Sequence, residues 1–341
     1  MNDRAAAISA IEASLPEAEL SNEDLAREFE EWDAEKILEK TGIATRHISG
    51  AAEFASDLGV AAAEALFRKH SVTPEEIDFL IFCTQSPDYF LPTTACTMQS
   101  RLGLRQSCGA IDVNQGCSGF VYGLALAKGL IETGSADRVL LITADTYTKF
   151  INPRDRSVKT LFGDGAAATL VKAVEHDDLL VGPFVFGTDG RGAANLMVPA
   201  GGLRTPRSVE TAVEQQDRAG NWRSQDNLFM NGPEIFNFTL RTVPRAVGQL
   251  LEKAGVGFEA IDYFVLHQAN RFMLETLREK MKIPAAKFCI ELESTGNTVS
   301  STIPIALGRL RERGAIVPGN RVMLVGFGVG YSWAATLVRI Q

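Results

Sequence analysis

Residues 77–83 read Ile-Asp-Phe-Leu-Ile-Phe-Cys, and residues 261–267, in the second half of the chain, read Ile-Asp-Tyr-Phe-Val-Leu-His. Each stretch is a short, continuous apolar run, which is typical of a strand buried on both faces of a sheet. Because the two stretches resemble each other position by position, they predict that the chain contains two copies of one structural unit.

Two further pairs of segments support this duplication. Residues 138–142 and 321–325 are again continuous apolar runs, and they follow the first pair at nearly the same spacing in both halves. Residues 167–172 and 334–339 close the two halves with an alternating pattern, which predicts strands at the edge of a sheet. A period this long excludes a solenoid, whose repeats span about 20 to 50 residues. It favours two similar halves packed as a pseudo-dimer.

The segments between these strands carry apolar residues three or four positions apart, which is typical of helices. Alternation of strands and helices indicates an α/β fold with mixed or parallel sheets. We expect the boundary between the halves near residue 175, so that they comprise residues 1–175 and 176–341. Residues 200–232 lack periodicity and predict a long loop, either a functional cover or an insertion without function. The predicted helices are 55–69, 118–133, 235–254, 270–281 and 301–313.

Composition limits the class of protein. The 341 residues carry a formal net charge of -8, which argues against nucleic acid or an anionic membrane as partner, because both require a basic surface. No apolar run approaches about 18 residues, and acidic residues occur early in the amino-terminal segment, so we expect neither a membrane span nor a secretion signal. The five cysteines are scattered without a CxxC pattern. This predicts reduced thiols, a cytoplasmic location and no metal site.

The segment Ile111–Phe120 leads from a short apolar strand through a turn of small residues into the predicted helix 118–133, so Cys117 lies at the amino terminus of that helix. Free backbone N–H groups and the helix dipole would stabilise a thiolate there, which is the nucleophilic form of cysteine. The alternative is a small buried cysteine at a close contact between helix and strand. The segment therefore indicates a nucleophile without proving one.

His267 directly follows a predicted buried strand, and sites in α/β proteins lie at such strand ends. Asn297 lies in a turn of small residues before another apolar helix. Taken singly, the histidine fits a structural hydrogen bond and the asparagine fits an ordinary turn equally well. The glycine-rich residues 326–330 could bring backbone N–H groups close to a substrate oxygen. The chain has no GxGxxG with its acidic partner and no GxxxxGK[ST], so no nucleotide cofactor is indicated.

Taken together and in order along nearly the whole chain, these segments resemble the ketoacyl-acyl-carrier-protein synthase III family. The resemblance implies a thiolase-like α/β fold, layered αβαβα, and an acyltransferase that needs no cofactor beyond coenzyme A or carrier-protein thioesters. It rests on Thr41-Gly42-Ile43 with Arg46 and His47, Gly116–Phe120, Phe162–Ala167, His267–Asn270, Gly296-Asn297-Thr298 and the final glycine turn.

By this resemblance Cys117 accepts an acyl group as a thioester. His267 and Asn297 then donate hydrogen bonds to the carbonyl of a malonyl thioester and stabilise the enolate that forms as carbon dioxide leaves. The backbone N–H groups of Cys117 and Val329 form a second oxyanion hole. The reaction is a decarboxylative Claisen condensation with malonyl carrier protein, which initiates fatty-acid or specialised acyl-chain synthesis.

The resemblance also implies a homodimer. Similar proteins place Phe327 behind the nucleophile and dimerise across the sheet of the first half, with a loop from the partner that corresponds to Phe90-Leu91-Pro92 reaching the acyl pocket. Leu91 replaces a bulkier aromatic residue there, which suggests a primer longer than acetyl.

The chain departs from the family at two substrate-binding positions. The family often stacks an adenine between a tryptophan and an arginine, but Lys36 and Lys40 occupy the corresponding helix positions. Trp32 stands one turn earlier, and Arg156 still matches the stacking arginine. The donor is therefore an acyl-coenzyme A or an acyl-carrier protein.

The expected docking site for an acyl carrier protein is also altered. Arg271 follows Asn270 directly, and Phe272 occupies the position at which the family usually has an arginine. If residues 270–281 are helical, Arg271, Arg278 and Lys282 lie near one face and form a basic strip suited to an acidic carrier; an ordinary solvated face fits equally well.

Two other readings remain open. The acyl-cysteine could pass its acyl group to a hydroxyl, amine or other acceptor in secondary metabolism or surface-sugar synthesis, which the departures at Lys36 and Arg271 would allow. A non-catalytic scaffold subunit would be expected to lack Cys117, His267 or Asn297, and all three are present.

Overall fold

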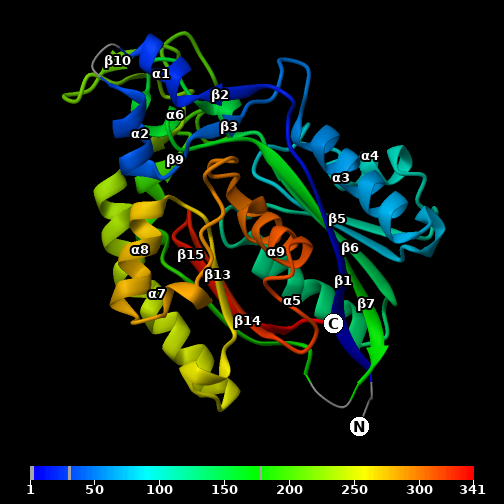
Figure 1. The fold of residues 1–341 in the computed structure, drawn as a ribbon. Coiled ribbons are helices and arrows are strands. Elements are labelled where there is room, and N and C mark those ends of the chain that lie inside the picture. Colours follow the sequence, from blue (N-terminus) through cyan, green and yellow to red (C-terminus); the bar gives the residue numbers. More distant parts are fainter. Residues whose placement is uncertain (1–3, 30–31, 177–178) are drawn as a thin grey trace.

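The computed structural model describes residues 4–29, 32–176 and 179–341, and it contains two main sheets (Figure 1). The first sheet has the strand order β1-β7-β6-β4-β5. Within it β4 is parallel to β5 and β6, whereas β7 is antiparallel to both of its neighbours. The strands are β1 (Arg4–Ser14), β4 (Phe79–Cys83), β5 (Gly109–Val113), β6 (Arg138–Asp145) and β7 (Gly165–Glu175).

The second sheet repeats this arrangement with the order β8-β15-β14-β13. From β8 to β13 the strand pairs are antiparallel, antiparallel and parallel, as they are from β1 to β4 in the first sheet. An isolated parallel bridge between Phe264 and Phe288 occupies the place of the fifth strand. The predicted duplication therefore extends to strand order and direction. The strands are β8 (Val181–Thr188), β13 (Tyr263–Leu266), β14 (Arg321–Gly328) and β15 (Ser332–Arg339).

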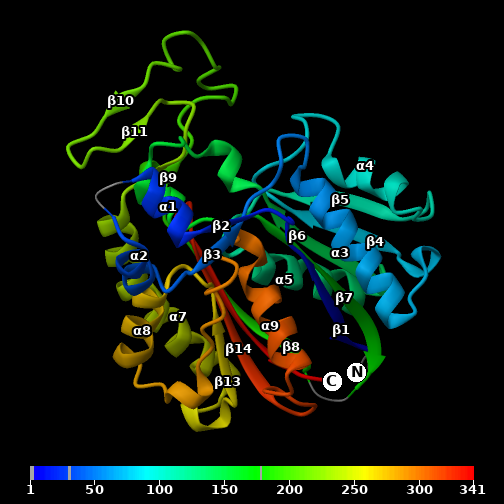
Figure 2. The ribbon, with the colours of Figure 1, turned by 45° about the horizontal axis from the view of Figure 1, so that its top comes forward.

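Helices form three layers that alternate with the two sheets. Helices α5 (Gly119–Glu132) and α9 (Thr302–Glu312) lie between the sheets, and α5 contacts strands of both (Figure 1). Helices α3 (Ala55–His70) and α4 (Thr94–Arg101) cover the outer face of the first sheet, while α7 (Gly232–Ala254) and α8 (Arg271–Lys280) cover that of the second (Figure 2). This is the predicted αβαβα layering, and the five predicted helices are all present with slightly shifted ends.

The prediction that residues 167–172 and 334–339 form edge strands is wrong. They belong to β7 and β15, which are interior strands flanked on both sides. On that side of each sheet the edge strand is instead β1 or β8. The apolar pattern did not reveal β1 because it is rich in alanine. Both faces of β1 are covered by helices, so small residues suffice to fill the space there.

Shorter elements gather beside the loop that follows β8, at the end of the molecule drawn at the top in Figure 2. This group consists of short helices and of strands that are two or three residues long. They are α1 (Asn22–Glu28), α2 (Ala34–Thr41), α6 (Arg156–Lys159), β2 (Glu19–Ser21), β3 (Thr45–His47), β9 (Leu196–Met197), β10 (Gln215–Gln216), β11 (Trp222–Arg223) and β12 (Phe229–Met230).

The predicted boundary between residues 1–175 and 176–341 remains a prediction. Strand β7 ends at Glu175. None of the helices in the described part of the chain is both long and apolar enough to cross a membrane.

Candidate active site

Cys117 lies in the turn between β5 and α5, as the sequence predicts. The Gly119 N–H donates to the Gly116 carbonyl at 2.7 Å, which closes the turn just before the helix. The Cys117 side chain is buried against the end of β14, where a Cβ atom on Gly328 would lie 2.7 Å from the Cys117 Sγ. Glycine at 328 therefore gives the thiol its space.

His267 and Asn297 reach the same place from the second half. His267 follows β13, and its backbone N–H donates to the Val325 carbonyl at 2.8 Å. Asn297 precedes α9 and is tied to the first half, because its N–H donates to the Leu161 carbonyl at 2.9 Å. Cys117, His267 and Asn297 all line one cavity of about 280 Å³. The structure therefore brings together the three residues that the sequence singled out.

The orientation of the Asn297 amide is determined by its neighbour. The Val299 N–H donates to the Asn297 Oδ1 at 3.0 Å. Because a backbone N–H can only meet the amide oxygen, the oxygen cannot be exchanged with the nitrogen in this site. The Nδ2 donors are therefore the part of Asn297 left for a ligand in the cavity.

Burial determines the charge of both titratable groups in the cavity. It raises the pKa of the Cys117 thiol to about 12, although the backbone N–H groups of Val329 and Cys117 act in the opposite direction. It also lowers the pKa of the His267 imidazole to about 3. The prediction of a thiolate stabilised by the helix terminus is wrong for the protein without substrate, because desolvation outweighs the N–H groups.

A neutral imidazole can donate from only one nitrogen, so the partner of its other nitrogen matters. The His267 Nδ1 lies 2.7 Å from the Thr302 Oγ1, and the Thr302 hydroxyl donates to the Val299 carbonyl at 3.1 Å. While the hydroxyl proton is given to Val299, Nδ1 carries the ring proton and donates to Thr302. When the hydroxyl turns to donate to Nδ1, the ring proton resides on Nε2. Thr302, which the sequence analysis did not identify, thus has the position to select the His267 tautomer.

The glycine-rich segment 326–330 supports the site from behind. The Phe327 ring meets the His267 ring edge to face, with centroids 5.5 Å apart, and is fully buried. The Val329 N–H interacts with the thiol. The roles of Phe327 and Val329 in binding substrate remain predictions.

The positions expected to bind the donor are Trp32, Lys36, Lys40 and Arg156, and Lys36 lies apart from the other three. Arg156 and Lys40 lie beside the Trp32 ring, with Arg156 Cζ 5.9 Å and Lys40 Nζ 4.9 Å from its centroid. Lys36 instead pairs with Asp33 at 2.8 Å and is exposed. Trp32 and Arg156 thus lie face to face, although the tryptophan comes earlier in the sequence than in the family.

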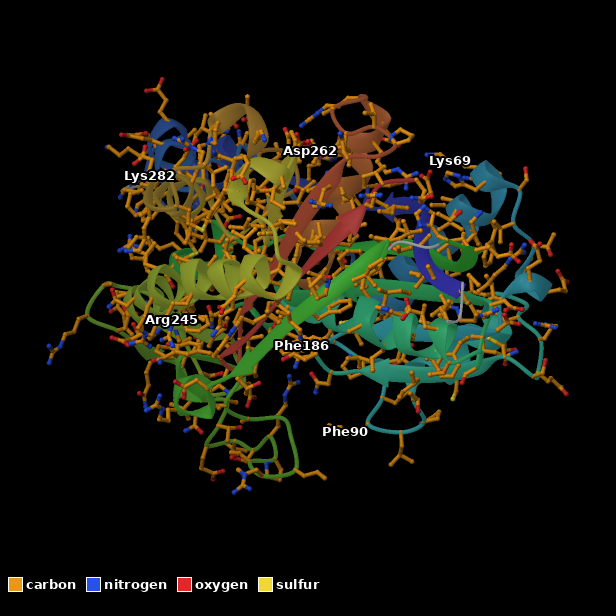
Figure 3. All side chains as sticks on the ribbon, turned by 90° about the horizontal axis from the view of Figure 1, so that it is seen from below. Lys69, Phe90, Phe186, Arg245, Asp262 and Lys282 are labelled. Carbon is orange, nitrogen blue, oxygen red and sulfur yellow. The ribbon has the colours of Figure 1, made fainter. Side chains whose placement is uncertain are left out.

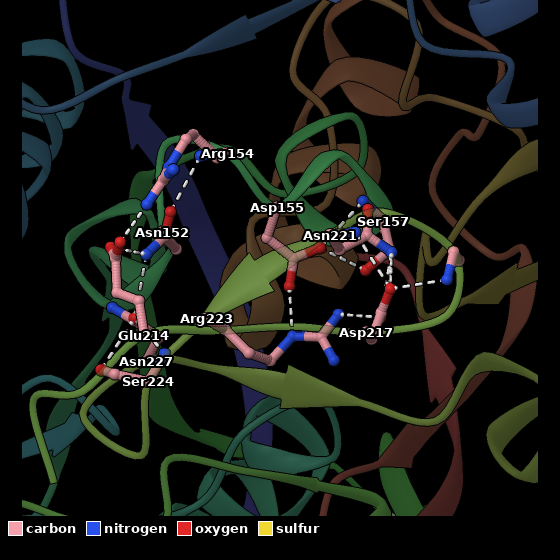
Figure 4. A network of polar contacts seen from close by, with 11 residues as sticks. Asn152, Arg154, Asp155, Ser157, Glu214, Asp217, Asn221, Arg223, Ser224 and Asn227 are labelled. Atoms are coloured by element: carbon pink, nitrogen blue, oxygen red, sulfur yellow. Dashed lines mark hydrogen bonds and ion pairs between the residues drawn. The ribbon is translucent and has the colours of Figure 1, made fainter.

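Residues 200–232 are joined by hydrogen bonds and ion pairs to residues 152–155 (Figure 4). Arg223 bonds to Asp155 at 2.7 Å and to Asp217 at 2.8 Å. Asp155 is fully buried, so this pair is largely shielded from water. The long loop is therefore attached to α6, whose residue Ser157 lines the Cys117 cavity.

The predicted basic strip on α8 is largely neutralised. Arg271 pairs with Glu293 at 2.8 Å, and Arg278 pairs with Glu275 at 2.5 Å. Lys282 is exposed and has no carboxylate partner among the residues that the structure describes. Phe272 is also exposed and stacks on Phe236, which lines the Cys117 cavity.

Leu91 lies on an exposed loop with Tyr89 and Phe90 and lines a second, larger cavity of about 1000 Å³. Figure 3 shows Phe90 at the periphery of the molecule. Over residues 4–29, 32–176 and 179–341, no group of three or more His, Cys, Asp or Glu side chains could hold a metal ion.

A duplicated α/β fold that buries a cysteine at this turn is that of the thiolase-like acyltransferases. Comparison with known proteins narrows the class. The family model described as 3-oxoacyl-[acyl-carrier-protein (ACP)] synthase III matches residues 111–190, and the model of its C-terminal part matches residues 251–340. A β-ketoacyl-[acyl-carrier-protein] synthase III from Caldanaerobacter subterraneus subsp. tengcongensis is 38% identical over 98% of both chains.

A second relative, β-ketoacyl-[acyl-carrier-protein] synthase III 3 from Streptomyces coelicolor, is 37% identical over 97% of this chain and 96% of its own. A crystal structure of a 3-oxoacyl-(acyl-carrier-protein) synthase III is 56% identical and superposes with a TM-score of 0.98, covering 98% of this chain and all of that one. The chain belongs to the β-ketoacyl-[acyl-carrier-protein] synthase III family. This confirms the predicted fold and the predicted class, an acyltransferase of the ketoacyl synthase III type.

Proposed function

We propose that the protein joins an acyl group carried on Cys117 to the two-carbon unit of a malonyl carrier-protein thioester, with loss of carbon dioxide. The observation that carries this proposal is the convergence of Cys117, His267 and Asn297 on one buried cavity. Family membership supports the reaction type, since the relatives are named for 3-oxoacyl synthesis.

In the first step the Cys117 sulfur attacks the carbonyl carbon of an acyl thioester. The bond from that carbon to the donor sulfur breaks, and the departing thiolate takes up the proton that Cys117 releases. Because the resting thiol is protonated, proton loss accompanies the attack. The N–H groups of Cys117 and Val329 are suited to bind the oxyanion of the tetrahedral intermediate.

In the second step the malonyl thioester loses carbon dioxide, and the electron pair of the broken bond forms an enolate. With the Thr302 hydroxyl turned from the Val299 carbonyl toward the His267 Nδ1, the Asn297 Nδ2 and the His267 Nε2–H would both donate to the enolate oxygen. A neutral imidazole suits this role, because it stabilises negative charge without surrendering its proton. The enolate carbon then attacks the acyl-cysteine, and the Cys117 thiolate leaves and is protonated.

The platform of Trp32 and Arg156 supports a nucleotide-bearing donor, that is, an acyl-coenzyme A. An aromatic ring facing a guanidinium can hold a purine between them by stacking and cation–π attraction. Lys40 beside the same ring adds a positive charge for a phosphate. We assign Lys36 no direct role in this platform, because it pairs with Asp33.

The acyl carrier protein would dock over α8, next to the exposed Phe272, which stacks on Phe236 in the lining of the Cys117 cavity. Arg271 and Arg278 would exchange their present partners, Glu293 and Glu275, for carboxylates of the carrier. Such exchanges between exposed ion pairs contribute little net free energy. Lys282 and the apolar surface of Phe272 would therefore contribute more than the two arginines.

A homodimer is also proposed. β5 is an edge strand of the first sheet, and its Ile111 is 44% exposed. Unpaired apolar edges of this kind usually pair with another strand. Tyr89, Phe90 and Leu91 extend the exposed apolar surface nearby. Light scattering should give the mass of a dimer, and Ile111→Lys should give a monomer; a monomeric native protein would contradict the proposal.

Intact-mass spectrometry tests the main proposal. Wild type and Cys117→Ala are incubated separately with acyl-coenzyme A, acyl-carrier protein and malonyl-carrier protein. We expect an acyl adduct on wild type that is absent from the variant, followed by 3-oxoacyl product and carbon dioxide once malonyl-carrier protein is added. An adduct that forms without condensation would favour transfer to a hydroxyl or amine acceptor, and the absence of an adduct with every donor would overturn the assignment of Cys117.

A further inference from the structure

Val299 holds a strained backbone conformation inside the core. Its φ of 54° lies in the left-handed region, which a side chain branched at Cβ rarely adopts because it crowds the backbone. Ser71 and Lys282, the other non-glycine residues with positive φ in the described part of the chain, are exposed. Val299 is fully buried in the 3-10 turn Val299–Ser301, directly before α9. Such strain persists only where neighbouring contacts enforce it, and it concentrates at functional sites.

Val299 contacts both residues that the proposed mechanism assigns to the enolate. Its N–H donates to the Asn297 Oδ1 at 3.0 Å, which leaves the Nδ2 donors for the cavity. Its carbonyl accepts from the Thr302 hydroxyl at 3.1 Å, and the Thr302 Oγ1 lies 2.7 Å from the His267 Nδ1. Burial lowers the pKa of His267, and the Val299 carbonyl acts on that pKa in the opposite direction. One strained residue therefore adjoins both predicted donors.

A carboxylate from the first half holds the residue that follows Val299. Ser300 donates twice to the Asp145 Oδ2, from its N–H at 3.3 Å and from its hydroxyl at 2.5 Å. Asp145 is the last residue of β6, and its Oδ1 accepts from the Gln85 N–H at 2.8 Å. Because the Val299 carbonyl and the Ser300 N–H belong to one planar peptide group, fixing the N–H fixes the direction of the carbonyl. We call the two bonds to Oδ2 the Asp145–Ser300 clamp.

Burial makes the clamp effective. Asp145 and Ser300 are both fully buried, so water cannot readily replace either bond. Burial raises the pKa of Asp145 to about 7, while the Ser300 hydroxyl and the Gln85 and Ser300 N–H groups act in the opposite direction. These donors favour the carboxylate, which accepts hydrogen bonds more strongly than the neutral acid does.

The neighbouring serine offers a comparison. Ser301 is also fully buried, and its hydroxyl donates to the Thr143 carbonyl of β6 at 2.9 Å. This bond also joins the two halves, but its acceptor is a neutral carbonyl, and it does not involve the peptide group between Val299 and Ser300. The two serines therefore separate general attachment of the turn from control of the Val299 conformation.

We propose that the Asp145–Ser300 clamp positions the enolate site by holding Val299 in its left-handed conformation. In that conformation the two peptide groups of Val299 orient the Asn297 amide and the His267 imidazole toward the malonyl thioester. The inference rests on the proposed function, because it concerns the decarboxylation step. Among the residues that the structure describes, the lining of the catalytic cavity includes neither Asp145 nor Ser300, so both act as positioning residues.

The test compares two rates for each variant. Release of labelled carbon dioxide from malonyl-carrier protein reports decarboxylation, and intact mass reports acylation by acetyl- or octanoyl-coenzyme A, whichever wild type uses faster. Ser300→Ala removes the hydroxyl of the clamp, and Asp145→Asn replaces the carboxylate with an amide that accepts through one atom only. We expect each to slow decarboxylation by roughly tenfold and acylation by less than about threefold. Ser301→Ala is the matched control and should keep the ratio of the two rates within about twofold of wild type.

A glycine at position 299 distinguishes positioning from packing. Glycine adopts positive φ without steric cost, so it does not depend on the clamp for this conformation. We expect Ser300→Ala to slow decarboxylation by roughly tenfold when residue 299 is valine, but by less than about threefold when Val299→Gly is already present. Removal of a second buried side chain would not repair a packing defect, so this rescue is specific to the proposed role.

Two results would overturn the inference. One is a ratio of decarboxylation to acylation in the folded clamp variants that equals that of wild type or of Ser301→Ala. The other is an equal loss from Ser300→Ala in the valine and glycine backgrounds. Melting temperatures identify the folded variants, and if Ser300→Ala or Asp145→Asn is unfolded, the other carries both comparisons. Failure of the proposed function gives a different result, because wild type would then release no carbon dioxide and form no adduct.

Discussion

The two halves share one fold but present different chemistry at equivalent positions. Cys83 ends β4, and His267 directly follows β13, the equivalent strand of the second half. Cys83 is fully buried, its Sγ donates to the Gln115 carbonyl at 3.2 Å, and a Cβ atom on Gly119 would collide with it. His267 is equally buried but lines the cavity. Equivalent strand ends therefore supply a packing residue in one half and a residue that lines the cavity in the other.

A second pair of positions shows the same division. Cys117 follows β5 and precedes α5, while Asn297 follows the bridging residue Phe288 and precedes α9. Each lies in a turn that leads into a central helix. The pseudo-dimer thus brings two equivalent turns to one cavity, and in the proposed mechanism one turn supplies the nucleophile and the other a donor of the oxyanion site.

The largest expected effect distinguishes Cys117 from Cys83, which is also buried in the first half. Cys117→Ala should lose acylation by more than roughly 10³-fold, as expected for removal of a nucleophile. Cys83→Ala should still form the acyl adduct and lose only about 1 to 2 kcal/mol of stability through the small cavity it creates. Adduct formation by mass spectrometry and urea unfolding provide the two measurements. Loss of the adduct in a folded Cys83→Ala would contradict its structural role.

The second comparison concerns the oxyanion site of the second half. His267→Ala and Asn297→Ala should each reduce decarboxylation of the malonyl thioester by roughly 10² to 10³-fold, because each removes one donor to the enolate. Acylation of Cys117 should be affected much less. Release of labelled carbon dioxide is compared with the rate of adduct formation, and an equal loss in both steps would argue against separate roles for the two turns.

The protonation of the thiol gives the third test. Because the pKa of Cys117 is raised to about 12, its thiolate fraction grows about tenfold per pH unit below that value. Alkylation of Cys117 by iodoacetamide should therefore accelerate about 10²-fold between about pH 7 and pH 9, without a plateau. The exposed Cys96 serves as the internal reference in the same peptide map. A plateau near neutral pH would instead indicate a thiolate stabilised by the helix terminus.

The smallest effect concerns the tautomer of His267. Thr302→Val keeps the size of the side chain but removes the hydroxyl that lies 2.7 Å from Nδ1. We expect decarboxylation to fall by roughly tenfold, as for the loss of one hydrogen bond that orients a catalytic group. Thr302→Ser is the matched control and should recover most of the rate. Equal losses in both variants would indicate that the packing of Thr302 matters and its hydroxyl does not.

Much of the fold was accessible from the sequence because the repeated apolar runs are long, continuous and buried. Strands β1 and β8 were not, and their absence led to β7 and β15 being placed at the sheet edges. An alanine-rich strand such as β1 has little intrinsic signal, and it is stabilised by the helices on both of its faces.

The site was predicted in part for a related reason. Each of Cys117, His267 and Asn297 is marked locally by a strand end or a turn. Thr302 carries no such mark, since its position beside His267 depends on a contact between residues distant in the sequence.

The sequence by itself determined that the chain is a duplicated α/β protein and which residues stand at its strand ends and helix starts, because hydrophobic periodicity and turn residues act locally. Only the tertiary structure decided that these ends converge on one cavity, that Cys117 is a protonated thiol, that Trp32 faces Arg156 and that Arg271 is already paired. Burial, charge pairing and cavity shape depend on neighbours that folding brings together, and no local pattern records them.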